Sequence, residues 1–239
     1  LPLEATHRAA KAAMGEYGGW LRPGWYGQGK AEDLIQAEVR RVRQSAGIMD
    51  ASPLGKVEVM GPDAEAFVNF IYYNTIKTLK PGNIRYGFML TEGGVVYDDG
   101  VITRVDQNRF IISCSSSHVE GVNALLEAWR QHGHDPDRIF VHDTTLNWPT
   151  VTISGPMARE LVSKLDLDID LSTAGFPHMS FREGAFQGAP ARVARVSFTG
   201  EISYEISVPV SAVDALWQTC IRLGEPMGIG PVGLEALSI

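Results

Sequence analysis

The fold is decided by the stretch VEVMGPDAEAFV, residues 57–68, which recurs in altered form as VTISGPMARELV, residues 151–162. Each copy alternates apolar residues as a half-buried strand does, passes through Gly-Pro, and continues with apolar residues at helical spacing. Glycine permits the turn, and we expect Pro62 and Pro156 at the first helical position, where the missing N–H costs no hydrogen bond. The repetition predicts two related strand–turn–helix units.

Each copy is followed by further elements that also repeat. Two β-branched runs at residues 84–90 and 95–105 are joined by Thr-Glu-Gly-Gly, and two runs at 191–198 and 202–208 are joined through Thr-Gly-Glu. Glycine-containing turns between such runs are hairpin signals. An apolar pattern of helical spacing then closes each half. We therefore predict an α+β fold of two related strand–helix–hairpin–helix units with antiparallel sheets.

The repeat also predicts the domain boundaries. We expect a first unit at residues 31–145 and a second at 146–239, preceded by an entry arm at residues 1–30. Pro23 and several glycines in this arm argue against regular structure there. The helical pattern at the C-terminus stops at Ile239 without a cap or breaker, so we expect the second unit to be truncated and the chain to be a piece of a longer protein.

Composition narrows the class of protein. The 239 residues are 44% apolar, with a net charge of −7 and no block of like charges, which argues against a general nucleic-acid surface. Apolar runs are far shorter than the ~20 residues that span a bilayer, and the first residues lack the pattern of an export signal. The two cysteines, Cys114 and Cys220, have no metal-ligand spacing. We expect a cytoplasmic protein without a metal site or a membrane span.

Two adjacent acids, Asp98 and Asp99, interrupt the run at 95–105, although acids are poor strand formers. Successive strand side chains point to opposite faces, so at most one of the two lines a site. A mechanism that needs both carboxylates on one substrate is excluded for this motif. The alternative is a turn or bulge with solvated acids, which Gly100 favours. The residues alone leave both interpretations open.

A second candidate lies in the hairpin at residues 197–205, where Glu201 occupies a turn and Glu205 lies inside an otherwise apolar strand. A glutamate at a turn is usually solvated. A carboxylate inside the strand either faces water or is held by donors, and an ionised carboxylate accepts two parallel N–H groups at once. Glu205 therefore suits a ligand with paired N–H donors.

Two further motifs resemble catalytic or metal sites. The stretch SCSSSH, residues 113–118, combines Ser, Cys and His, but serines ahead of a helix are far more often caps, and no orienting partner for a nucleophile is visible. His132 and His134 lie in a Gly- and Pro-containing exit from a helix, where a solvated turn is favoured over metal binding. The sequence contains no dinucleotide or P-loop fingerprint, so bound nucleotide is not indicated.

A series of short motifs runs along the chain. In order, they are MDASPLGK (49–56), GP (61–62), RYG (85–87), GGVVYDDG (93–100), GP (155–156), FTGE (198–201) and YE (204–205). In this order they resemble the aminomethyltransferase family of the glycine cleavage system, from about residue 28 to the end of the chain. The branch that looks most similar contains the folate-binding C-terminal part of the alpha subunit of heterotetrameric sarcosine oxidase.

The resemblance implies roles for particular residues. Asp99, the second acid of its pair, corresponds to the catalytic carboxylate of the family, and Glu205 corresponds to the glutamate that grips the pterin ring of tetrahydrofolate. Both assignments fit the chemistry, because a pterin presents N3–H beside its 2-amino group and a carboxylate stabilises a cationic iminium. The other residues expected along the folate pocket are Leu54, Tyr86, Ser113 and Ser115.

The resemblance also implies a function and partners. We expect a tetrahydrofolate-dependent one-carbon transferase that accepts carbon, as an imine or formaldehyde, from the oxidation of sarcosine or a similar N-methyl amine and yields methylenetetrahydrofolate. Flavin and NAD would belong to a partner region or a flavoprotein subunit. The family normally continues into a C-terminal barrel domain, which we expect to be missing here. The alternatives are a non-catalytic folate-binding scaffold and a folate-dependent demethylase.

Overall fold

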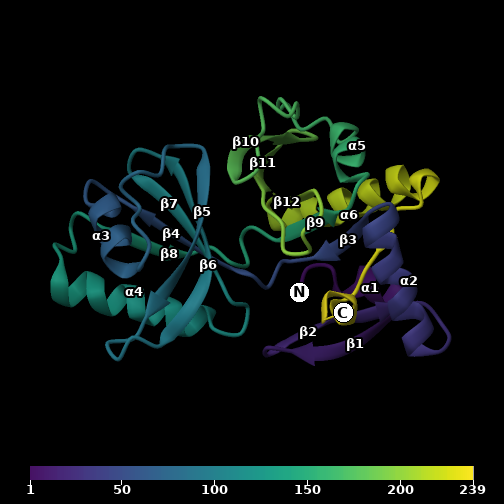
Figure 1. Ribbon diagram of the computed structural model, residues 1–239, viewed down its shortest axis with the longest axis horizontal. Coiled ribbons are helices and arrows are strands. Elements are labelled where there is room, and N and C mark those ends of the chain that lie inside the picture. The colour runs from purple at the N-terminus through teal and green to yellow at the C-terminus, as the bar shows by residue number, and fades with distance from the viewer. Residues whose placement is uncertain (239) are drawn as a thin grey trace. The chain divides into compact units, whose positions relative to one another are not determined.

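The computed structural model describes residues 1–238, so Ile239, the last residue of the expected second unit, lies outside the described residues. The described chain divides into two compact units, whose elements are labelled in Figure 1. Unit 1 contains residues 1–53, 146–178 and those from 182 onward, and unit 2 contains residues 54–145 and 179–181. No helix within the described chain is both long and apolar enough to cross a membrane.

This division is not a split into consecutive halves. Strand β3 (Gly47–Asp50) pairs antiparallel with β9 (Thr150–Ser154), with Gly47 opposite Ser154. The segment before residue 54 is therefore built into the same unit as the segment after residue 146. A long-range pairing of this kind is not encoded in the local periodicity from which the expected boundaries were drawn.

Unit 1 combines a sheet with helices and a separate hairpin. The strand order in its sheet is β13-β3-β9-β12-β11-β10, with β13 parallel to β3 and the pairs β3–β9, β9–β12 and β12–β11 antiparallel. Its further elements are α1 (Glu4–Ala9), β1 (Ala12–Tyr17), β2 (Trp20–Tyr26), α2 (Ala31–Gln44), α5 (Ala158–Ser163), β10 (Ser180–Phe186, from residue 182 onward), β11 (Ala189–Arg195), β12 (Ser203–Ser207), α6 (Val210–Gly224), β13 (Gly230–Pro231) and the 3₁₀ helices Glu225–Met227 and Leu234–Ser238. Leu161 of α5 and Trp217 of α6 pack into its core with Ile153 of β9.

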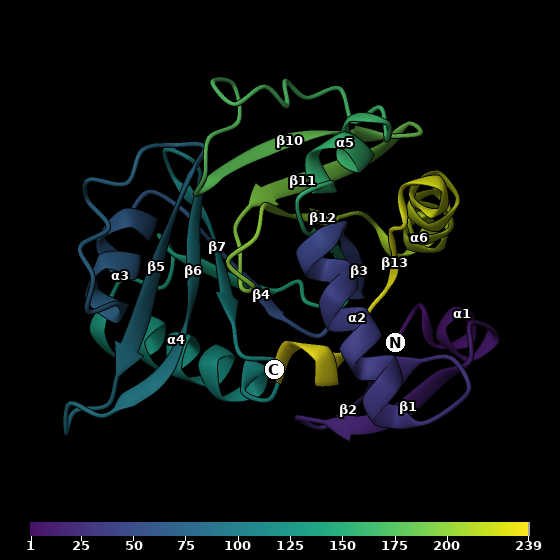
Figure 2. The same ribbon diagram turned by 45° about the vertical axis from the view of Figure 1, so that its right-hand side comes forward.

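Unit 2 is an antiparallel sheet covered on one face by two helices. Its elements are β4 (Gly55–Met60), α3 (Ala64–Ile71), β5 (Asn83–Leu90), β6 (Val96–Asp106), β7 (Arg109–Cys114), α4 (Val119–Gly133) and β8 (Phe140–Asp143), with strand order β5-β6-β7-β4-β8. Phe67 of α3 and Val122 of α4 share one buried cluster with Ile102 of β6 and Ile112 of β7. Both helices therefore cover the same face of the sheet, as Figure 2 also shows. We call the opposite face the outer face of unit 2.

The repeat predicted from the sequence is present as β4 followed by α3 and β9 followed by α5. Gly61 and Gly155, which end the two strands, have φ of +122° and +142°. A Cβ at Gly61 would lie 2.2 Å from the carbonyl oxygen of Arg138, and one at Gly155 would lie 2.4 Å from that of Ser45. Only glycine satisfies both the backbone angle and the close approach at these turns.

The predicted helix starts were wrong by two residues. The helices begin at Ala64 and Ala158, so Pro62 and Pro156 lie in the preceding turns rather than at the first helical position. The N–H of Ala64 donates to the carbonyl oxygen of Gly61 (3.1 Å), which closes the first of these turns. Proline fits this position because its fixed φ suits the second residue of a turn.

Residues 1–30 contain regular structure, which corrects the expectation of an irregular arm. Strands β1 and β2 pair antiparallel, and Pro23 lies opposite Met14 where the register shifts. Gly18 and Gly19, with φ of +60° and +80°, form the turn between the strands. Proline and glycine commonly interrupt regular structure, but a hairpin tolerates them at a bulge and at its turn.

A buried polar network joins this hairpin to the rest of unit 1. His7 Nε2 lies 3.0 Å from Asp50 Oδ2, and its Nδ1 lies 3.0 Å from the Tyr26 hydroxyl. Burial opposes ionisation of Asp50, but hydrogen bonds from His7 and Ser52 outweigh it and hold the pKa of Asp50 below its usual range. Arg22 donates to the carbonyl oxygen of Asp50 (3.0 Å). The network therefore docks α1 and β2 on β3.

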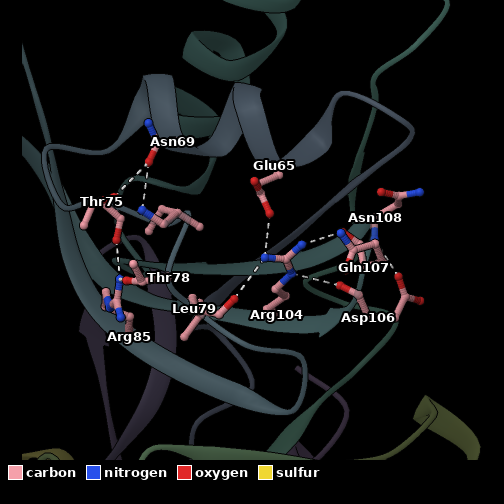
Figure 3. A network of polar contacts seen from close by, with 11 residues as sticks. Glu65, Asn69, Thr75, Thr78, Leu79, Arg85, Arg104, Asp106, Gln107 and Asn108 are labelled. Carbon is pink, nitrogen blue, oxygen red and sulfur yellow. Dashed lines mark hydrogen bonds and ion pairs between the residues drawn. The ribbon is translucent and has the colours of Figure 1, made fainter.

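Arg104 on β6 holds three segments of unit 2 together (Figure 3). Its side chain is 4% exposed. The guanidinium donates to the carbonyl oxygens of Leu79 and Gln107 (2.9 Å each) and pairs with the carboxylate of Glu65 on α3 (2.7 Å). One side chain thus closes the turn after β6 and fixes the loop between α3 and β5.

The same loop is held at a second point, also drawn in Figure 3. Asn69 Oδ1 accepts the N–H of Ile76 (2.8 Å). Arg85 of β5 donates to the carbonyl oxygen of Thr75 and to the hydroxyl of Thr78 (3.0 Å for the latter). The loop that connects α3 to β5 is therefore anchored to both elements.

Replacing Arg104 with Met is expected to lower the free energy of unfolding by about 3 kcal/mol, because the buried carbonyl group of Leu79, the carbonyl group of Gln107 and the carboxylate of Glu65 would lose their donor. Arg138, whose exposed guanidinium pairs with Asp63 at 2.6 Å, offers a matched control. Arg138→Met should change stability much less, since exposed ion pairs contribute little. Urea unfolding of the two variants makes the comparison, and equal effects would contradict the assigned role of Arg104.

Candidate active site

Asp98 and Asp99 point to opposite faces of β6, as strand alternation predicts. Asp98 is 6% exposed and lies opposite the buried Met89 of β5. Asp99 is exposed and lies opposite Phe88. Met89 belongs to the cluster beneath α3 and α4, so Asp99 is the acid on the outer face of unit 2.

The buried acid of the pair has a structural role. Asp98 Oδ1 accepts the hydroxyl of Ser115 (2.6 Å) and the backbone N–H of Asp99 (2.8 Å). Its Oδ2 lies 3.6 Å from His118 Nδ1. The register between β5 and β6 also shifts just before this pair, so a bulge is present as in the alternative interpretation, although Asp98 is buried and not solvated. Asp98 thus ties β6 to the segment before α4 and fixes the backbone that carries Asp99.

Two of the residues predicted to form the site are in direct contact. Tyr86 lies two positions from Phe88 on β5, and its hydroxyl donates to Asp99 Oδ2 (2.6 Å) across the ladder. This hydrogen bond raises the pKa of Tyr86, because ionising the phenol would break it and place two negative charges side by side. The contact also orients the Asp99 carboxylate.

An aromatic pair on the outer face was missed by the sequence analysis. The rings of Tyr73 and Phe88 stack with centroids 5.3 Å apart and an angle of 12° between planes. The alternation of β5 places Phe88 on the same face as Tyr86, and this was the available signal. Nothing in the local pattern indicated Tyr73, which precedes the anchored loop.

The stretch at residues 113–118 does not form a nucleophile site. Burial raises the pKa of the Cys114 thiol to about 12, which keeps it protonated. The Ser115 hydroxyl donates to Asp98 and not to His118. The prediction of a serine cap was also wrong. Helix α4 begins at Val119, directly after His118, and has no side-chain cap. The hydroxyl of Ser115 donates to Asp98 instead.

The two histidines after α4 have local contacts. His132 Nδ1 lies 2.8 Å from the carbonyl oxygen of Ala128, and the ring of His134 packs edge-on against Phe67, with centroids 5.0 Å apart. Among residues 1–238, no group of three His, Cys, Asp or Glu side chains is arranged to hold a metal ion. The contacts therefore assign a packing role to His134.

The remaining residues expected along the folate pocket lie in unit 2. Leu54 is half-buried before β4, and its carbonyl oxygen accepts the ammonium of Lys56 (2.7 Å). Ser113 is half-buried on β7, and its carbonyl oxygen would lie 2.0 Å from a Cβ at Gly100. Gly100 thus permits the close approach of β6 to β7. The folate-binding roles of Leu54, Ser113 and Ser115 stay predictions.

Glu205 belongs to unit 1, whereas Asp99 belongs to unit 2. Glu205 is half-buried on β12, between Ala194 of β11 and Thr152 of β9. Glu201 at the preceding turn pairs with Arg43 (3.0 Å). Of the two glutamates, only Glu205 is therefore placed within the sheet.

The profile of the GCVT N-terminal domain matches residues 3–239. The chain belongs to the GCVT N-terminal domain family. The resemblance noted from the ordered motifs is thereby confirmed, and so is the α+β fold class, because a solved structure of the family superposes on nearly the whole chain.

This GCVT N-terminal domain is similar to two curated proteins and to one solved structure. It is 35% identical to sarcosine oxidase subunit alpha of Corynebacterium sp. (strain P-1), covering 100% of the chain and 25% of that protein. It is 33% identical to an aminomethyltransferase of Chlorobium luteolum, covering 96% of the chain and 60% of that protein. The glycine cleavage system aminomethyltransferase T from Bartonella henselae matches with a TM-score of 0.84 and 27% identity, covering 99% of the chain and 60% of that structure. The chain spans a quarter to three fifths of these relatives.

In this GCVT N-terminal domain, the hydrogen bond between Tyr86 and Asp99 predicts that the pKa of Tyr86 depends on the charge of Asp99. Asp99→Asn should lower the pKa of Tyr86 towards its ordinary value, because the asparagine carries no charge to oppose phenolate formation. Ultraviolet titration of tyrosinate, with Tyr86→Phe to assign the signal, measures the change. A Tyr86 pKa that is the same with and without the Asp99 charge would contradict the hydrogen bond.

Proposed function

We propose that this domain binds tetrahydrofolate and transfers to it a one-carbon unit from an N-methyl amine such as sarcosine, giving methylenetetrahydrofolate. The observation that carries the proposal is the exposed Asp99 carboxylate, which is bonded by Tyr86 while the adjacent Asp98 takes the structural contacts. Relatives named aminomethyltransferase and sarcosine oxidase subunit alpha support a one-carbon reaction of this class.

The residues assigned to tetrahydrofolate have suitable chemistry. Glu205 offers a half-buried carboxylate on a central strand of its sheet, which suits the paired N–H donors of a pterin edge. Tyr86 presents an exposed ring on the outer face of unit 2. When bound, tetrahydrofolate would supply the nitrogen atoms that accept the carbon. The carboxylate of Glu205 and the ring of Tyr86 are therefore the groups that would suit tetrahydrofolate.

Asp99 would act through its charge and its position. A fixed carboxylate stabilises positive charge that develops on the carbon donor. The Tyr86 hydroxyl occupies Oδ2, so Oδ1 is the oxygen placed to accept or return a proton at a reacting nitrogen. Asp98, through its bond to the N–H of Asp99, keeps the backbone in place. Asp99 would therefore be the catalytic acid, and Asp98 would hold the backbone of Asp99 in place.

The oxidation that releases the carbon would take place outside this domain. Oxidising an N-methyl amine requires an electron acceptor, and we assign this step to a flavin-containing region or partner subunit. A relative of this chain is named as one subunit of an oxidase, which supports such an assembly. The small N-methyl amine and the folate would then be its small-molecule partners.

The full-length protein provides the test. Calorimetry should detect tetrahydrofolate binding, and an assay with sarcosine and related N-methyl amines should detect methylenetetrahydrofolate. Absence of binding would contradict the proposal. Binding without product from any of these amines would favour the folate-binding scaffold in its place.

A further inference from the structure

The outer face of unit 2 carries an aromatic pair next to Asp99. Tyr72 forms an antiparallel bridge with Met89, and both side chains are buried. The next residue, Tyr73, therefore lies on the outer face together with Phe88. The N–H of Tyr73 donates to the carbonyl oxygen of Phe88 (3.1 Å), and the two rings are stacked. The pair thus extends the outer face beyond the edge of β5.

The order across this face is Tyr73, Phe88 and Asp99. Phe88 and Asp99 are directly opposite in the ladder, so their Cβ atoms lie roughly 5 Å apart. Tyr73 stacks on Phe88 from the side away from β6, so the other face of the Phe88 ring is directed towards Asp99. Tyr73 is 71% exposed and Asp99 is exposed. The carboxylate is therefore bordered by an aromatic ring on the solvent side of the sheet.

The position of the pair is fixed by its surroundings. Asn74 Oδ1 accepts the N–H of Phe88 (3.2 Å). The next residue, Thr75, is bonded by Arg85, as Figure 3 shows. Arg85 and Phe88 are three positions apart on β5, so their side chains point to opposite faces of the strand. The Arg85 guanidinium is directed to that loop, away from the outer face. A pair held in this way is already arranged for binding.

We propose that Phe88, backed by Tyr73, and the Asp99 carboxylate form a subsite for the methylated ammonium or iminium group of the amine donor. A ring face attracts a compact cation and packs against its methyl groups, and the carboxylate adds the opposite charge. Neutral formaldehyde gains from neither. The subsite therefore selects the carbon in cationic, amine-bound form; the identity of the donor rests on the proposed function, whereas the binding of a methylated cation does not.

Choline and its neutral isostere 3,3-dimethylbutan-1-ol probe the subsite in the full-length protein. Choline should bind the wild type more tightly than the isostere does. Phe88→Leu should weaken choline binding about fivefold, as expected for one cation–π contact. Tyr73→Leu, which removes only the ring that backs Phe88, should weaken it less. Tyr73→Phe should keep it, and so should Phe70→Leu, which removes an exposed ring of α3 that packs edge-on against Trp129. Equal binding of choline and the isostere, or no loss in the leucine variants, would overturn the proposal.

Turnover separates this inference from the proposed function. Phe88→Leu should lower the share of the oxidised carbon that is recovered as methylenetetrahydrofolate rather than as free formaldehyde, while the rate of amine oxidation and the Kd of tetrahydrofolate stay unchanged. A weakened Kd of tetrahydrofolate with an unchanged share of recovered carbon would make the pair a wall of the folate site, which overturns the inference and leaves the function standing. Choline binding that depends on Asp99, in a protein that does not bind tetrahydrofolate, would support the subsite and reject the function.

Discussion

Replacing Asp99 with Asn in the full-length protein is expected to lower the rate of methylenetetrahydrofolate formation by about 10²- to 10⁴-fold. Asparagine keeps the size of the side chain and still accepts the hydroxyl of Tyr86, but it carries no charge and cannot exchange a proton. Tetrahydrofolate binding should be retained, with a Kd within about threefold of the wild type. Steady-state assays and calorimetry on the same preparation measure both quantities.

Asp106 provides the matched control for this variant. It is an exposed acid at the end of the same strand, and its Oδ1 accepts the N–H of Asn108 (2.8 Å). Asp106→Asn keeps this turn, because an asparagine oxygen accepts the same bond. We expect wild-type turnover from the control. Wild-type turnover from Asp99→Asn as well would remove the catalytic role and leave a folate-binding scaffold.

The second large effect is expected at Glu205. Glu205→Gln should raise the Kd of tetrahydrofolate about 10- to 100-fold, because the amide replaces one of two charged acceptors with a donor that faces the N–H groups of the pterin. The variant should therefore show both weaker binding of tetrahydrofolate and a lower kcat/KM for tetrahydrofolate. Calorimetry with tetrahydrofolate measures it directly.

Glu201 is the matched control within the same hairpin. Its carboxylate pairs with Arg43 at a partly exposed turn, so Glu201→Gln should leave the Kd of tetrahydrofolate unchanged. A Glu205→Gln variant that binds as tightly as this control would show that Glu205 does not hold the pterin. The pair of variants compares the same chemical change inside the strand and at the turn.

Much of the fold follows from local pattern. The repeated strand, glycine turn and helix are present as β4–α3 and β9–α5, and the hairpin expected at 84–105 is β5–β6. The prediction of an irregular entry arm is wrong because a register shift in the hairpin accommodates Pro23. The pairing of β3 with β9 joins distant segments, and no period within either segment encodes it.

The candidate site was predictable only in part, for a similar reason. Alternation along β6 separates Asp98 from Asp99, but which acid faces the helices depends on the ladder with β5. The bond from Ser115 to Asp98 depends on the exit of β7. The stacking of Tyr73 on Phe88 depends on a loop that Arg104 and other distant side chains anchor. Contacts of this kind arise from packing and not from spacing.

The most direct test of the account is a crystal structure of the full-length protein with folinic acid, an unreactive folate. We expect density for the ligand in contact with the carboxylate of Asp99 and the ring of Tyr86 on the outer face of unit 2. Folinic acid bound elsewhere, with the Asp99 carboxylate still solvated, would contradict the role assigned to Asp99.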